Sequence, residues 1–257
     1  MTWITSEGDS LEEHRHARDV GCRVVDWNCV FQTSLPLTGE VDAIIASSGS
    51  YKLIKAVDRV KIQASNVTLD LNGFTVNKNI NIQAYSNIVV KNGFVLGIGV
   101  SEAITSIANK NVIISNLEIN SASNGVYVGA EVSNTSENIV IRETNIATPA
   151  NRYGVHIKHA KAVIIDNVNI VAPSGSISSG ISLEGEGSVV RDCMIQGHQY
   201  GIGHGTKGRL NSISGTTFYD VPTPISNSEI VSNGNAFFRF VSYFYSPLSP
   251  NTNAGQN

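Results

Sequence analysis

Hydrophobic and polar positions follow one recurring pattern along most of the chain. Each repeat has an apolar residue, a second one two positions later, a turn-forming residue four positions after the first, and another apolar residue seven positions after the first. Val112, Ile114, Asn116 and Ile119 are one example. Apolar residues at alternate positions that end at a turn residue are typical of short β-strands. The pattern therefore predicts short strands joined by tight turns.

The pattern occurs seven times, and successive copies begin 21 to 27 residues apart. The first residues of the copies are Val67, Ile88, Val112, Ile139, Val163, Ser188 and Asn211. A period of this length is typical of a solenoid, in which each coil buries its apolar side against the neighbouring coils. We therefore predict an all-β fold, a right-handed single-stranded parallel β-helix of about seven coils.

A second signal lies between the repeats. There a glycine is followed by apolar residues at alternate positions, beginning at Gly125, Gly154, Gly180 and Gly201. Each coil therefore has two clear strands and a brief third strand near the last apolar residue of the repeat. Such strands cannot bury their apolar faces alone, but they can when coil stacks on coil.

Two segments of the repeat resemble a known family. Asn66-Val-Thr-Leu-Asp-Leu-Asn-Gly73 and Ser86-Asn-Ile-Val-Val-Lys-Asn-Gly93 are similar to repeats of the pectate-lyase-like superfamily of parallel β-helix proteins. The resemblance covers about residues 50–235. It implies the fold but not one activity, because the superfamily includes lyases, hydrolases, epimerases, phage tailspikes and structural rods.

The turn-forming position of the repeat is most often Asn or Asp. These residues tolerate the left-handed backbone conformation that a sharp turn needs. Their side chains can also bond to the same position in the next coil. We therefore expect a stacked polar ladder, made of Asn72, Asn92, Asn116, Asn167 and Asp192.

The two ends of the chain lack the repeat. Residues 1–50 are predicted to form an N-terminal cap with a short helix within 11–25, because a β-helix exposes open backbone and apolar core at its ends. The β-helix itself is assigned to residues 51–235. Residues 236–257 are predicted to form a capping or assembly tail that begins with an aromatic segment, Ala236–Tyr245.

Charge and composition narrow the class of partners. The net charge is -3 and no run of Lys or Arg occurs, so neither nucleic acid nor an anionic membrane surface is an expected partner. No apolar stretch is long enough for membrane insertion. The N-terminus shows no leader, which leaves a cytoplasmic, a virion-associated or a processed extracellular protein open. Pairing of Cys22 with Cys29 also stays open.

One outer face of the predicted helix carries most of the candidate chemistry. On the strand after each marker glycine, alternate side chains point outward. The outward residues are Tyr127, His156, Lys158 and Glu184. Stacked coils lie about 5 Å apart, so these side chains are expected to share one surface.

The longest polar loops lead into the same strand and enlarge this surface. They add Arg152, Tyr153, His198 and Tyr200. His204 lies in the matching region of the next coil, although at a position predicted to face inward. Aromatic and hydrogen-bonding side chains on a rigid scaffold suit a polysaccharide ligand. The plain alternative is that they are ordinary solvated residues.

Two kinds of catalysis were compared for this face. A lyase that acts on uronic acids needs a base, for which His156 or Lys158 is the candidate, and a cation such as Arg152 to neutralise the sugar carboxylate. No cofactor is predicted, and calcium is weakly supported because only Glu184 and Glu186 lie near. The acidic motifs of polygalacturonases are absent, so no hydrolase role is assigned.

A second face carries an apolar stripe. It comprises Val89, Ile113, Val140, Ile164 and Val189, all at outward positions. A continuous exposed stripe indicates a covered surface, and trimeric β-helix fibres associate through such faces. The sequence favours a polysaccharide-binding β-helix, with lyase-type activity left open. The alternative is a non-catalytic structural or assembly protein, for example a virion, fibre or appendage component that forms a homo-oligomer.

Overall fold

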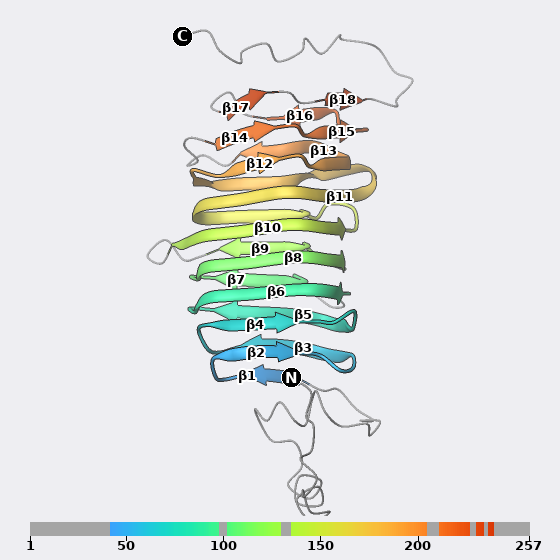
Figure 1. The fold of residues 1–257 in the computed structure, drawn as a ribbon. Coiled ribbons are helices and arrows are strands. Elements are labelled where there is room, and N and C mark those ends of the chain that lie inside the picture. The colour runs from blue at the N-terminus through green and yellow to red at the C-terminus, as the bar shows by residue number, and fades with distance from the viewer. Residues whose placement is uncertain are drawn as a thin grey trace, which may run out of the picture.

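The computed structural model describes residues 42–97, 102–129, 135–204, 211–226, 230–233 and 236–238. Over these ranges the chain forms β-strands and no helix, and the strands pair in parallel. Figure 1 shows the coils stacked one on another from β1 at one end to β18 at the other. The prediction of an all-β parallel solenoid is confirmed.

The strands of the described residues follow one another in chain order. They are β1 (Asp42–Ile45), β2 (Gly49–Lys52), β3 (Val57–Ile62), β4 (Val67–Asp70), β5 (Thr75–Gln83), β6 (Ser86–Val95), β7 (Ile104–Ile107), β8 (Lys110–Asn120), β9 (Val126–Gly129), β10 (Ser136–Ala147), β11 (Val155–Glu186), β12 (Val189–Arg191), β13 (Met194–His204), β14 (Asn211–Ser214), β15 (Thr217–Tyr219), β16 (Thr223–Ile225), β17 (Ile230–Asn233) and β18 (Ala236–Phe238).

The predicted repeats stack in register. The second apolar position of each repeat forms one column of Cα partners, which runs through Leu69, Val90, Ile114, Ile141, Ile165, Val190 and Ile213. All of these side chains are fully buried. Because each coil covers the apolar side of the next, burial of this column is a main source of stability for the fold.

The solenoid extends beyond the range predicted for it. β1 pairs with β3 and β2 pairs with β4, so coils begin inside the segment assigned to the cap. At the other end β18 pairs with β15, so the first three residues of the predicted tail continue the stack. The predicted helix within 11–25 and the rest of the tail lie outside the described residues.

The turn-forming position adopts the predicted left-handed conformation in every repeat. Its φ angle lies between +51° and +62° at Asn72, Asn92, Asn116, Glu143, Asn167, Asp192 and Gly215. The side-chain ladder at this turn is shorter than predicted. Asn116 Nδ2 donates to Asn92 Oδ1 at 2.9 Å, and Glu143 then takes the position of the next Asn and interrupts the series.

A longer asparagine ladder lies at the opposite end of the same strand. It is formed by Asn66, Asn87, Asn111 and Asn138, each with φ between +55° and +58°. The Nδ2 atoms of the last three donate to the Oδ1 of the asparagine one coil earlier, at 2.8, 2.9 and 3.1 Å. Four coils are therefore joined side chain to side chain at one edge of the sheet.

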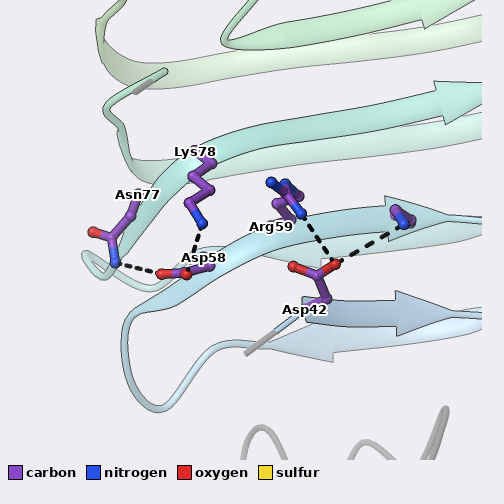
Figure 2. A network of polar contacts seen from close by, with 6 residues as sticks. Asp42, Asp58, Arg59, Asn77 and Lys78 are labelled. Carbon is purple, nitrogen blue, oxygen red and sulfur yellow. Dashed lines mark hydrogen bonds and ion pairs between the residues drawn. The ribbon is translucent and has the colours of Figure 1, made fainter. Parts of the chain in front are cut away.

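Ion pairs link neighbouring coils on the outer surface. Figure 2 shows Asp58 held by Asn77 and Lys78 of the next coil, at 3.1 and 3.3 Å, beside the pair formed by Arg59 and Asp42 at 3.5 Å. The hydrogen bond from Asn77, followed by Lys78 and Arg59, lowers the pKa of Asp58. Partly exposed pairs of this kind contribute little to stability.

Candidate functional site

The strand after each marker glycine points alternate side chains inward and outward, as predicted. The inward residues Val126, Val128, Val155, Ile157, Ile181 and Leu183 are fully buried. Of the outward ones, Tyr127, His156 and Glu184 are partly exposed and Lys158 is exposed. The scaffold therefore fixes these four side chains on one surface, as the alternation of the strand requires.

Tyr127 and His156 form the centre of this surface. They are Cα partners in β9 and β11, and their ring centroids lie 5.3 Å apart in an edge-to-face arrangement. The phenol ring of Tyr127 lies over Gly129, where an added Cβ would overlap it. Gly129 is therefore needed for the observed position of the Tyr127 ring.

Tyr153 completes an aromatic group around His156. Its ring centroid lies 4.6 Å from that of the imidazole. The main-chain N–H of Tyr153 donates to Asn124 Oδ1 at 2.9 Å, and Asn124 Nδ2 donates to Glu102 Oε1 at 3.3 Å. Glu102 and Asn124 thus lie at the candidate site, and neither is among the residues predicted from the sequence. The sequence does hold one signal for Asn124. It stands directly before the marker glycine Gly125, as Tyr153 stands directly before Gly154.

Charged groups approach the rings from both directions along the stack. Glu184 Oε1 lies 4.0 Å from His156 Nε2. Burial lowers the pKa of His156, an effect that Lys158 reinforces and that Glu184 and Glu102 oppose. Burial and the same two carboxylates raise the pKa of Tyr127. At neutral pH the site therefore presents a neutral imidazole and a protonated phenol beside two carboxylates.

Arg152 and Tyr200 lie at the edge of this group. Arg152 is exposed, and its main-chain carbonyl accepts a hydrogen bond from the Ser178 hydroxyl at 2.7 Å. Tyr200 is the Cα partner of Ser179. Gly180 lies beside Gly154, so Ser179 occupies the coil between Tyr153 and Tyr200. The two tyrosines therefore share one column, two coils apart.

His198 does not face the predicted surface. Its side chain is fully buried, with an exposed fraction of 0%. Its Nδ1 lies 3.2 Å from Ser178 Oγ, and burial lowers its pKa to about 4. The predicted ligand-binding role is therefore corrected. The segment 196–200 is part of β13 rather than a loop, and shifts in its register with β11 place His198 opposite Ser176.

His204 ends β13, where its Cα pairs with that of the inward-facing Leu183. This backbone position matches the inward phase expected from the sequence. His204 is therefore not aligned with the outward column of Tyr127 and His156, and its assignment as a ligand-binding residue stays a prediction.

The apolar stripe is continuous but only half exposed. Val89, Ile113, Val140, Ile164 and Val189 are consecutive Cα partners on five coils. Each is partly buried, because β-branched side chains at this spacing cover one another. The stripe therefore exposes less apolar surface than five isolated side chains would.

Neither a metal-binding cluster nor a membrane-spanning helix occurs in the part of the chain that the structure describes. Within that part, no three His, Cys, Asp or Glu side chains come together as metal ligands would. The same residues contain no helix with the length and hydrophobicity needed to cross a membrane.

Comparison with known proteins supports the fold. No protein-family model and no curated protein matches the chain. A hyperthermoactive exopolygalacturonase from Thermotoga maritima matches in structure with a TM-score of 0.50 and 12% identity, over 74% of this chain and 55% of that one. The chain thus spans about half the length of that enzyme. At this identity the likeness confirms the parallel β-helix fold that the sequence resemblance implied.

A second solved structure matches more weakly. The A-module of a mannuronan C-5 epimerase from Azotobacter vinelandii aligns with 10% identity over 81% of this chain and 90% of that chain. Its TM-score is 0.28, which is too low to bear on the site.

Proposed function

We propose that the chain binds a polysaccharide on the surface formed by Tyr127, Tyr153, His156 and Glu184. The observation that carries the proposal is the aromatic group, with Tyr127 and Tyr153 both packed against His156 on an outer face. Partly exposed aromatic rings offer an apolar surface to the face of a sugar ring. The carboxylates beside them supply the hydrogen-bond acceptors that sugar hydroxyls need.

A glycan array probed with the purified full-length chain tests this proposal. We expect binding to at least one oligosaccharide, and we expect Tyr153→Ala and His156→Ala each to weaken it about tenfold, as for a lost aromatic contact at a binding site. Phe94→Ala is the matched control, because Phe94 is an aromatic residue with 45% exposure on another face. Absence of binding, or equal loss in all three variants, would overturn the proposal.

Lyase-type catalysis is a second proposal for the same surface. It is favoured by the lowered pKa of His156, because a general base must be unprotonated at the working pH. In this scheme His156 or Lys158 removes the proton next to the sugar carboxylate, and Arg152 neutralises that carboxylate. An assay of the ultraviolet-absorbing unsaturated product on uronate polysaccharides tests it. A wild-type rate equal to the rates of both His156→Ala and Lys158→Ala would overturn it.

Assembly through the apolar stripe is a proposal of a different class. The in-register column from Val89 to Val189 favours it. Mass measurement in solution tests it, and we expect a homo-oligomer that Val140→Asp dissociates. A monomer at high protein concentration would exclude this alternative.

A further inference from the structure

The charges around the aromatic group lie on successive coils. Glu102 lies in the coil of β7, Tyr127 in the next coil and His156 in the one after. Glu184 follows one coil further on, since Gly180 lies beside Gly154. The two backbone positions are therefore three coils apart, about 14 Å along the axis. They also lie in different columns, because Glu102 stands three positions before the column of Tyr127 and His156 and Glu184 two positions after it.

Two carboxylates and one cation act on the two rings. Glu102 also accepts a hydrogen bond from Asn124 at 3.3 Å, and Glu184 lies 4.0 Å from the imidazole of His156. Both act on Tyr127 and both act on His156, where Lys158 opposes them. Arg152 is exposed, and the contact described for it is through its main-chain carbonyl.

We infer that the ligand of this surface is an uncharged oligosaccharide whose hydroxyl groups donate hydrogen bonds to Glu102 and Glu184. The inference rests on the proposed binding function and narrows it to one substrate class. A carboxylate accepts two or more hydrogen bonds and donates none when ionised. It therefore suits the hydroxyls of a neutral sugar.

A uronic acid fits the same surface poorly. When the sugar ring stacks on Tyr127 or Tyr153, the sugar carboxylate would lie near Glu102 or Glu184. Two negative charges close together repel each other. The inference therefore also opposes the lyase proposal, since that reaction requires a uronate.

Equilibrium binding to matched ligands tests the inference. The probes are polygalacturonate, alginate and their carboxyl-reduced, neutral counterparts, together with an array of neutral oligosaccharides. We expect the wild-type chain to bind neutral ligands about tenfold more tightly than carboxylated ones, the ratio that a repulsion of about 1.4 kcal/mol gives. Glu184→Gln and Glu102→Gln should each narrow this ratio, because each removes one negative charge and keeps an acceptor.

Glu118→Gln is the matched control, because Glu118 is exposed on a different column and bonds to Asn145 at 3.0 Å. It should leave the ratio unchanged. Equal or tighter binding of the carboxylated ligands would overturn the inference while leaving the binding function intact. A ratio that narrows equally in Glu118→Gln would also overturn it, since overall charge would then be the cause. Failure to bind any glycan would overturn the proposed function itself, and the inference with it.

Discussion

Tyr127 and His156 are Cα partners on adjacent coils, and their rings meet edge to face at a centroid distance of 5.3 Å with an angle of 71° between them. The ring of Tyr153 also contacts the imidazole, at a centroid distance of 4.6 Å. Stacking of the coils is therefore what fixes the orientation of His156, and each ring can be tested for its part in that orientation.

A double-mutant cycle on Tyr127→Leu and His156→Leu should show that the two rings stabilise each other. Aromatic pairs contribute about 0.5–1.5 kcal/mol beyond the area they bury. The expected coupling in the free energy of unfolding, measured with urea, lies in that range. A control cycle that pairs Tyr127→Leu with Phe94→Leu should be additive, because no contact joins those columns. Additive effects in the first cycle would contradict the packing described.

Gly129→Ala should destabilise the chain by about 1–3 kcal/mol, as overpacking does. The cause is specific, because the added methyl group meets the phenol ring of Tyr127. Tyr127→Ala removes that ring, so the same glycine substitution should cost far less in the Tyr127→Ala background. Urea unfolding of the four proteins measures both costs. If Gly129→Ala destabilises the Tyr127→Ala protein as much as it destabilises the wild type, the cause lies in the backbone and not in the contact with the ring.

The stability of the chain should fall between pH 6.5 and pH 4 because of His198. Its pKa is about 4 in the folded chain against an ordinary value of 6.5, so the unfolded state binds the proton more readily. The contribution is fully present above pH 6.5 and is lost as the pH falls toward the folded pKa. The total loss is about 3 kcal/mol.

Urea unfolding of the wild-type chain and His198→Asn across this pH range measures the effect. The variant should lose less stability on acidification than the wild type does. Parallel curves for the two proteins would show that His198 does not contribute to the pH dependence.

Asn111→Ala should destabilise the chain by about 2 kcal/mol. It removes two hydrogen bonds of the asparagine ladder, to Asn87 and from Asn138, and it places Ala at a φ of +55°, where a Cβ is strained. Asn111→Gly should cost less, because it removes the bonds without the strain. Thermal unfolding with Asn120→Ala as an exposed control measures both, and equal costs for Ala and Gly would contradict the strain.

The fold could be predicted because its signal is repeated. One alternation of Val112 and Ile114 before Asn116 is ambiguous, but seven copies at a regular period leave few other structures. The longer asparagine ladder was available in the same way, since Asn66, Asn87, Asn111 and Asn138 each stand directly before the first apolar residue of a repeat. The predicted ladder lies at the turn after the strand, whereas the longer ladder lies at the turn before it.

The site could be predicted only where strand alternation applies. Tyr127, His156 and Glu184 were placed correctly because period-two alternation decides which side chains point outward. Glu102 and Asn124 were missed because they lie in bends before their strands, where no period holds. His198 was misplaced because the ladder between β11 and β13 shifts register between Val171 and Ser179. A register shift is a property of the pairing, which a single segment of sequence does not show.

The column that holds Tyr153, Ser179 and Tyr200 sets a fixed distance between two phenol groups. Its two phenols stand two coils apart, about 10 Å at the spacing of β-strands, with a small residue between them. The spacing along such a column is set by the backbone hydrogen bonds between coils, so it is the same from each coil to the next. A polymer whose own repeat equals two coils would present the same group to both phenols, and a polymer with another repeat would not. Selection by length of repeat is thus available to this scaffold before any individual side chain recognises a functional group.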